Sequence, residues 1–336
     1  MKTPIYSLSL AAQATLDMHS LNNEGGEGNQ IQTRMVNIVD HEGNMHYVNA
    51  ISGDMLKHIQ SEHFFRLARE HNLPLCAGCQ QFDANRINAD AQYQESINGK
   101  TDVEALDMLL ERCALDDIAG ILVTAKGRSL PRKSVIEFGW VLGLPETAAA
   151  TNQSFFHVKY ARDRSDAERE GARSQRAQKS GDTDEKTGGT NLQQAIFHRP
   201  ASSSIYAIVC NIELSRVGYN DIRQRYALDE QQRHRRCRVL LESVLHTFVQ
   251  MNGAMRSTQL PHLVALKGVL TYTTAVLPAP LISPLQPDYR EQMQALASRL
   301  GDGTGVTASS FETLSDLADS LNALFERSPY TMQVPA

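Results

Sequence analysis

Short apolar runs recur along the chain and predict the strands of a sheet. Residues 5–12 form a strand-like apolar segment, and residues 31–39 alternate between apolar and polar positions. Residues 118–125, 204–214 and 264–276 are short apolar or β-branched runs, a pattern typical of buried strands. Helical patterns lie between these runs. Their order favours an α+β fold built on one main sheet.

Capping residues mark the helices between the strands. Ser52 is a predicted N-cap for a helix that begins at residue 53 or 54, and residues 101–104 form a capping box at the start of another. A long amphipathic helix is expected after Asp229, with Gly253 as its C-cap. Two further helices close the chain, and a capping box at residues 309–312 is expected to start the second.

The segment 162–190 differs from the rest of the chain. It contains no aromatic residue and no Val, Ile or Leu, and its basic and acidic residues balance. Such a segment cannot offset its ordering entropy by burial, so we expect it to be mobile. Strand-like residues flank it at 154–160 and 192–198, which predicts a hairpin within 150–200 that has a mobile tip. A linker between two domains is the alternative.

Length, charge and cysteine content narrow the class of protein. At 336 residues the chain can bury a large core, as one elaborated domain or as two. The net charge of -5 argues against a strongly basic, freestanding nucleic-acid binder, although a basic stripe on an acidic body is compatible with it. No apolar run approaches the roughly 18 residues that span a bilayer, so no membrane partner is expected. Five cysteines without a signal peptide favour reduced thiols and a cytoplasmic location.

Residues 20–34 are dense in amides and glycines and end in an arginine. Glycine lets a backbone approach a ligand closely, and Asn and Gln side chains both donate and accept hydrogen bonds. Arg34 can pair with a phosphate through two parallel hydrogen bonds. The residues alone leave open a contact with a polar ligand and an ordinary glycine-rich connection. The candidate contacts are Asn22, Asn23, Gly28, Asn29, Gln30 and Arg34.

Four pieces of the chain, taken in order, resemble one protein family. They are Ser20 to Glu24 with Gly28, Asn29 and Arg34; Ile51 to His58; Ser204 to Ala207 with Arg216 to Tyr219; and Gly253 to Ser257 before Pro261. The ordered set covers nearly the whole chain. It resembles the DevR-type backbone (crRNA-binding) subunit of type I CRISPR Cascade complexes. The last piece is poorer in glycine than the corresponding segment of that family.

The resemblance implies a ferredoxin-like, RRM-like palm with helical insertions and a protruding thumb β-hairpin. The apolar runs agree with a split β-α-β-β-α-β core, so residues 1–336 are expected to form a single elaborated domain. A chain longer than a bare RRM needs insertions, and we expect a mostly helical one at 40–115 and the thumb at 150–200. The RRM stacking motif is absent, which favours phosphate and sugar contacts over base stacking.

The resemblance also implies a scaffold without catalytic residues or a cofactor. Copies of such subunits polymerise along a guide RNA, and the thumb folds over the RNA so that the remaining bases can pair with target DNA. The implied partners are crRNA, the target DNA strand, further copies of the same chain and other Cascade subunits.

Further segments are candidate RNA contacts. Ser52, Gly53, Lys57 and His58 lie at a predicted helix start, where amide groups can bind phosphate; a capped surface helix is the alternative. The basic cluster after residue 125 can bind phosphate or form a solvated loop. The aromatic pair of the predicted thumb can wedge between bases or lie in the core. These remaining candidates are Lys126, Arg128, Arg132 and Lys133; Phe155, Phe156 and Lys159; and Arg256 and Ser257.

A second basic group is expected on the long helix, and it is Arg233, Arg235, Arg236 and Arg238. The helix dipole disfavours cations near a helix start. A solvated face is the common outcome of such a run, and a neighbouring subunit or RNA is the alternative.

Two residue groups raise the question of metal chemistry. Cys76 and Cys79 form a single CxxC motif, which is compatible with zinc or with a redox pair. Zinc needs four ligands, and His63, His71 and Cys113 lack standard spacing to this motif. Several histidines and acids in the first quarter suggest a metal nuclease, but no HExxH or paired-carboxylate pattern supports one. That group is His41, His46, His58 and His63 with Asp17, Asp54 and Glu62. No metal ligand is therefore assigned.

The sequence thus predicts a non-catalytic, guide-RNA-binding scaffold subunit of a type I CRISPR effector. Two other functions compete with this prediction. One is a metal-dependent nuclease that processes nucleic acid, and the other is a self-regulating nucleic-acid-binding regulator.

Overall fold

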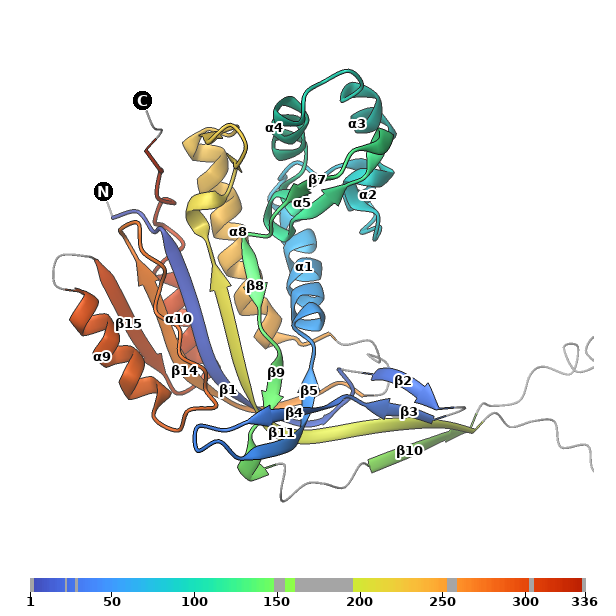
Figure 1. Cartoon of the computed structure of the whole chain (residues 1–336), viewed down its shortest axis with the longest axis vertical. Coiled ribbons are helices and arrows are strands. Elements are labelled where there is room, and N and C mark those ends of the chain that lie inside the picture. The colour runs from blue at the N-terminus through green and yellow to red at the C-terminus, as the bar shows by residue number, and fades with distance from the viewer. Residues whose placement is uncertain are drawn as a thin grey trace, which may run out of the picture.

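A computed structural model of the chain describes residues 3–21, 23–27, 30–147, 155–160, 196–252, 259–301 and 305–333. Only the backbone is described for residues 23–27, 30–33, 126, 155–160 and 196–200. The described residues form a mixed fold with a large, mostly antiparallel sheet and several helices, which confirms the predicted α+β class (Figure 1).

Long antiparallel strands form the centre of this sheet. β1 (Ser7–His19) lies between β11 (Ile196–Ile212) and β14 (His262–Thr273), and it runs antiparallel to both. β15 (Val306–Phe311) pairs with β14 on the outer side. The other side of the sheet continues through shorter strands, with β8 and β9 both beside β11, then β5 and β4. These strands are β8 (Ile136–Phe138), β9 (Val141–Gly143), β5 (Met45–Ile51) and β4 (Met35–Val39).

Alternation along β1 separates the two faces of the sheet. Leu10 pairs with Cys210 on one side and with Leu270 on the other, and all three lie in the main core. The next residue, Ala11, faces the opposite side and belongs to a second, smaller core with Val269. Period-two alternation therefore gives each face of the central sheet its own apolar layer.

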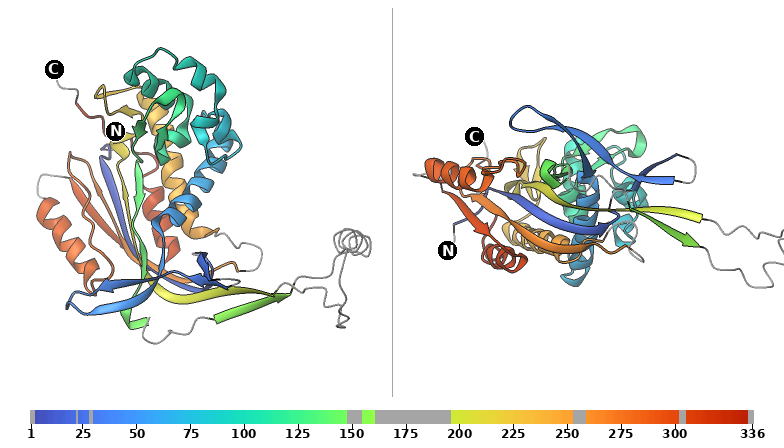
Figure 2. Two further views of the ribbon diagram at one scale, coloured as in Figure 1. Left: turned by 45° about the vertical axis from the view of Figure 1, so that its right-hand side comes forward. Right: turned by 90° about the horizontal axis from the view of Figure 1, so that it is seen from below.

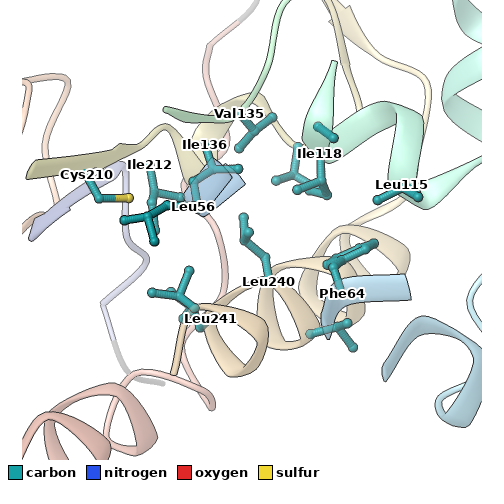
Figure 3. Close-up of a cluster of buried hydrophobic side chains, with 14 of the residues drawn as sticks. Leu56, Phe64, Leu115, Ile118, Val135, Ile136, Cys210, Ile212, Leu240 and Leu241 are labelled. Atoms are coloured by element: carbon teal, nitrogen blue, oxygen red, sulfur yellow. The ribbon is translucent and has the colours of Figure 1, made fainter. Parts of the chain in front are cut away.

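Helices cover both of these faces. Residues from α1 (Gly53–Glu70), α8 (Glu230–Val249) and α10 (Leu314–Asn322) contribute to the main core, and residues from α9 (Tyr289–Gly301) contribute to the smaller one. Leu56 and Phe64 of α1 and Leu240 and Leu241 of α8 lie between the helices and the sheet (Figure 3). Ile136 of β8 belongs to the same cluster.

A group of short elements follows α1 and lies at the far end of the molecule from β10 (Figure 1). Its helices are α2 (Ala77–Gln80), η1 (Arg86–Ala89), α3 (Ala91–Ser96), α4 (Asp102–Arg112) and α5 (Ala114–Ala119). A two-stranded sheet completes it, formed by β6 (Ile121–Val123) and β7 (Leu130–Arg132), with the turn η2 (Ala125–Gly127) between them. The connection from β11 to α8 contains η3 (Leu214–Arg216), β12 (Tyr219–Asn220) and β13 (Arg225–Tyr226).

An arm of strands projects from the other end. β10 (Phe155–Tyr160) pairs antiparallel with the first residues of β11, from Phe155 with Ala201 to Tyr160 with Ile196. β2 (Asn23–Glu27) and β3 (Gln30–Thr33) form a hairpin, and β3 also meets β11. Figure 2 shows β10 and the adjoining part of β11 extending beyond the helices in both views. The tip predicted at 162–190 lies outside the described residues.

Most of the predicted helix starts are confirmed. Ser52 caps α1, residues 101 and 104 form the capping box of α4, and Asp229 caps α8. The strand predicted at 118–125 is confirmed only for residues 121–123, because α5 extends to Ala119 and is followed by its C-cap Gly120, whose φ of 68° suits glycine. Only β6 remains as a strand there, and it belongs to the small sheet.

One predicted helix C-terminus and one predicted helix start differ from the structure. α8 ends with Gln250 as its C-cap, so it stops before Gly253, which lies outside the described residues. The capping box expected at 309–312 is wrong because residues 306–311 pair with β14. The true box is Thr313 with Asp316, which starts α10.

Candidate nucleic-acid interface

An arginine stacked on an exposed tryptophan marks one surface near the edge of the main sheet. Arg34 lies between β3 and β4, and its guanidinium carbon is 4.8 Å from the centre of the Trp140 ring. Trp140 lies between β8 and β9, and 45% of it is exposed. The ring quadrupole attracts the cation, and the guanidinium presents a planar fork of donors that matches phosphate geometry.

The start of α1 meets the same connection. Ser52 caps the helix, with its hydroxyl accepting a backbone N–H of the first turn at 3.3 Å. Gly53 lies so close to the β8–β9 connection that a Cβ there would be 2.4 Å from the carbonyl oxygen of Phe138 and 2.9 Å from that of Gly139. Gly139 immediately precedes Trp140. The structure therefore brings together two segments that the sequence singled out separately.

Lys57 extends this surface along α1. It lies one turn after Gly53, is half-buried, and interacts with the charge of Glu137 in β8. Burial, and to a lesser degree the nearby Arg86, lowers the pKa of its ammonium group. Asp54 is exposed in the first turn of the helix and opposes the positive charge there. We define the Arg34–Trp140 surface as Arg34, Ser52, Gly53, Lys57 and Trp140.

His58, the last candidate of this segment, is exposed and turns to a different neighbour. Its ring centre is 5.6 Å from that of Phe82. It therefore contacts the group of short elements that follows α1.

A buried chain of hydrogen bonds fixes β5 against β11. The N–H of Leu21 donates to Nδ1 of His19 at 3.4 Å, so Nε2 carries the proton and donates to the Tyr206 hydroxyl at 2.6 Å. That hydroxyl donates to Oδ1 of Asn49 at 2.8 Å, and Nδ2 of Asn49 donates to Ser202 at 3.2 Å. Burial lowers the pKa of His19 to about 4. The neutral ring thus completes a network that crosses three strands.

Part of the predicted RNA-binding set cannot be placed. Five of its members lie outside the described residues, and they are Asn22, Gly28, Asn29, Arg256 and Ser257. Only the backbone is described for six others, which fall in β2, β3, η2 and β10. These six are Asn23, Gln30, Lys126, Phe155, Phe156 and Lys159. Their RNA contacts stay predictions.

The basic cluster predicted after residue 125 does not form one surface. Lys133 is exposed and lies 3.6 Å from the carboxylate of Glu137. Arg128 donates to the carbonyl oxygen of Ile97 at 3.0 Å and pairs with Asp102 at 2.5 Å, which fastens it to the start of α4. The third described member, Arg132, is only 2% exposed.

Asp117 of α5 explains why Arg132 is buried. Its Oδ1 accepts from Nη2 of Arg132 at 2.7 Å, and its Oδ2 accepts from Nη1 of Arg236 at 2.8 Å. The N–H of Gly218 donates to both oxygens, at 3.2 and 3.0 Å. Arg132 is therefore a structural ion-pair residue and not an RNA contact, which corrects the sequence prediction. The sequence pattern placed Arg132 on the surface, but a buried carboxylate such as Asp117 needs a buried cation as its partner.

The arginines of α8 divide in the same way. Arg236 pairs with Asp117, and the equally buried Arg233 lies 3.6 Å from the ring centre of Tyr226 and donates to the carbonyl oxygen of Tyr330 at 2.7 Å. The expectation of a solvated face is therefore wrong for these two residues. Both fasten α8 to other parts of the chain.

The family model described as "CRISPR-associated negative auto-regulator DevR/Csa2" matches residues 10–294. The chain belongs to the DevR/Csa2 family. A curated relative, "CRISPR-associated protein Cas7/Csa2 1" of Saccharolobus solfataricus, is 26% identical over 161 residues, which are 46% of this chain and 50% of the relative. The chain therefore matches about half the length of that relative.

Two solved structures resemble this DevR/Csa2 protein at low identity. One is described as "CRISPR RNA-guided surveillance complex", with a TM-score of 0.44 and 10% identity over 95% of this chain and 98% of that chain. The other is described as "CRISPR RNA-guided surveillance complex, pre-nicking", with a TM-score of 0.46 and 11% identity over 95% and 99%. The assignment to the DevR/Csa2 family depends on the sequence match and not on these likenesses.

The DevR/Csa2 match contains the whole Arg34–Trp140 surface. Sequence reasoning missed Trp140, although a signal existed. It is the only tryptophan of the chain and follows a glycine between two three-residue strands. A large aromatic in so short a connection favours an exposed ring over a core position.

One group of candidate metal ligands comes together within the part of the chain that the structure describes. It consists of Cys76, Cys79, Cys113 and Asp116, all buried. Hydrogen bonds with Cys113 and Cys79 lower the pKa of Cys76 to about 5, whereas burial raises the pKa of Cys113 and of Asp116. Cys113, which lacked standard spacing in the sequence, is thus brought to the CxxC motif by the fold.

The histidines considered for a nuclease turn to separate partners. His46 lies 2.6 Å from Asp40 in the β4–β5 hairpin, and His63 lies 2.9 Å from the carbonyl oxygen of Gln250.

Among the described helices, none is long and apolar enough to cross a bilayer.

Proposed function

We propose that this DevR/Csa2 protein is a non-catalytic scaffold subunit of a type I CRISPR surveillance complex. In this role it binds guide RNA (crRNA), polymerises along it with further copies of itself, and supports pairing of the guide with target DNA. The observation that carries the proposal is the Arg34–Trp140 surface, where a stacked arginine meets a helix start that carries a lysine one turn further on. The family membership supplies the CRISPR context for defence.

The groups on this surface suit an RNA backbone better than base edges. Arg34 offers a planar guanidinium, and Lys57 adds a positive charge one turn into α1. The first amides of α1 point along the helix axis, where they favour an anion. Contacts to phosphate and sugar position a nucleic acid without reading its sequence. A subunit that must accept every guide needs this kind of contact.

The strand order supports a ferredoxin-like palm. Along the chain β1, α1, β8, β11, α8 and β14 follow the order β-α-β-β-α-β, and in the sheet β14, β1, β11 and β8 are neighbours. Both helices contribute to the same apolar core. The projecting β10–β11 pair is the natural candidate for the thumb of a single elaborated domain (Figures 1 and 2).

Purification of the full-length protein from cells that transcribe a CRISPR array tests the proposal. We expect oligomers that retain small RNA, detected by light scattering and a denaturing gel, and no cleavage of RNA or DNA with Mg²⁺ or Mn²⁺. A monomer without RNA would contradict the scaffold role. Metal-dependent cleavage that disappears when His58 or Asp54 is replaced, with RNA binding retained, would establish the nuclease instead.

A further inference from the structure

The buried Cys76 cluster is built from two copies of one local arrangement. Cys76 is the N-cap of α2 and accepts the N–H of Cys79 at 3.4 Å, while Cys113 is the N-cap of α5 and accepts the N–H of Asp116 at 3.4 Å. In each copy the capping thiol and the residue three positions later face the same point. The fold therefore delivers four ligand side chains from two separate segments.

The four ligand atoms are spaced for one small ion. All lie within 4.8 Å of one another, and Oδ2 of Asp116 is 3.3 Å from Sγ of Cys76 and 3.4 Å from Sγ of Cys79. A tetrahedral zinc ion with Zn–S bonds of about 2.3 Å and a Zn–O bond of about 2.0–2.2 Å places its ligand atoms about 3.5–3.8 Å apart. The carboxylate–thiol distances of 3.3 and 3.4 Å lie just below this range and the widest separation of 4.8 Å lies above it, so side-chain adjustments of about 1 Å or less bring the four atoms to that geometry.

Surrounding residues hold the ligands in place. Nε of Arg86 lies 3.5 Å from Oδ1 of Asp116, an oxygen without a hydrogen-bond partner, so the other oxygen is left for the thiols. Gly78 allows the close approach, because a Cβ at this position would lie 2.2 Å from the carbonyl oxygen of Arg86. Asp90 accepts the N–H of Ala77 at 2.9 Å, which fixes the first residue of α2. Such outer contacts orient ligands and stabilise the charge of a metal site.

We propose that Cys76, Cys79, Cys113 and Asp116 bind one Zn²⁺ ion. Three thiolates and a carboxylate form a soft, negatively charged donor set that suits zinc and not Mg²⁺ or Ca²⁺. Four protein ligands fill a tetrahedron and leave no position for a substrate, so the ion is structural. It fastens α2 to α5 across the intervening α3 and α4. Any ligand that is still protonated releases its proton to solvent on binding, and the zinc–ligand bond replaces the bond to hydrogen.

Metal content of the full-length protein, purified under reducing conditions without chelator, tests this site. We expect one zinc ion per chain by mass spectrometry, and a Co²⁺-exchanged sample with thiolate charge-transfer bands and tetrahedral d–d bands. Cys113→Ser should lose bound zinc. Cys237→Ser is the matched control, because Cys237 is also a buried free thiol but lies in α8, and it should keep the full content.

A second pair of measurements removes the ambiguity of a misfolded variant. Chelation of zinc from the wild-type protein should lower its melting temperature, and added Zn²⁺ should restore it. Asp116→Cys, which keeps four ligands, should retain the ion. The proposal is overturned if the reduced wild-type protein neither retains zinc nor shows cobalt bands, or if Cys76 and Cys79 are joined by a disulfide in it. Failure here would leave the RNA-binding proposal untouched, because that surface uses other residues.

Discussion

Asp117 is enclosed by two arginines and a backbone amide, so its charge is stabilised only while these partners are present. Asp117→Asn removes the charge, which leaves the buried guanidinium of Arg236 without its acidic partner and that of Arg132 paired only with Asp221. We expect a loss of about 3–5 kcal/mol in the free energy of unfolding, measured by urea denaturation.

The matched control for this charge is Glu326, which pairs with Arg238 at 3.4 Å with both side chains exposed. Glu326→Gln should change the free energy of unfolding by no more than about 1 kcal/mol. Equal losses in the two variants would show that the Asp117 network does not stabilise the fold.

His19 gives the folded protein a dependence on pH. Its pKa is about 4 in the fold against 6.5 for the free side chain, so between these values the unfolded chain binds a proton that the folded chain excludes. The contribution of His19 to stability is complete above pH 6.5 and is lost as the pH falls toward 4. Between pH 7 and pH 4.5 the wild type should lose about 2 kcal/mol more than His19→Gln. Parallel pH profiles of the two proteins in denaturant titrations would refute this role.

At the scale of elements, the close packing of the start of α1 against the β8–β9 connection depends on Gly53. A Cβ on Gly53 would meet the backbone carbonyl oxygens of Phe138 and Gly139, which cannot move without shifting the connection that carries Trp140. We expect Gly53→Ala to reduce the free energy of unfolding by about 1–3 kcal/mol. Gly301 is the matched control at the end of α9, because a Cβ there would lie 3.4 Å from the nearest atom. If the Gly53→Ala protein were as stable as the Gly301→Ala protein, close packing of Gly53 against the β8–β9 connection would be contradicted.

Helices and strands were predictable from sequence where a local signal, such as a helix cap, determines the structure without a distant partner. The cap at Ser52, the capping box of α4 and the helix start after Asp229 were predicted because each of these signals is local to its own helix end. Residues 309–312 were misassigned because their partner, β14, is distant in sequence, whereas the strand at 118–125 was drawn too long because residues 118 and 119 end α5. Pairing with β14 makes residues 306–311 a strand whatever their capping pattern.

At the scale of the whole molecule, the sequence indicated the segments that form the site but not that they lie next to each other in the fold. Arg34 and the start of α1 were singled out as separate candidates, whereas the β8–β9 connection that joins them was not. Cys113 was noted downstream of the CxxC motif without a role, since α3 and α4 separate the two segments along the chain. Arg132 was assigned to the site although it lies elsewhere, because the basic residues around it in the sequence do not reveal its buried partner Asp117. Convergence of distant segments is a tertiary property that spacing in one chain does not encode.

RNA affinity across a salt series tests the central claim most directly. The full-length protein would be titrated against labelled single-stranded RNAs of two unrelated sequences, with Arg34→Ala beside Arg69→Ala. Arg69 is the matched control, because its guanidinium carbon lies 5.6 Å from the Phe65 ring near the other end of α1.

If the Arg34–Trp140 surface binds the RNA backbone, Arg34→Ala weakens both RNAs about equally and lowers the slope of log affinity against log salt by about one, while Arg69→Ala leaves both unchanged. A loss confined to one RNA sequence, or an Arg34→Ala protein that binds as tightly as Arg69→Ala, contradicts the account.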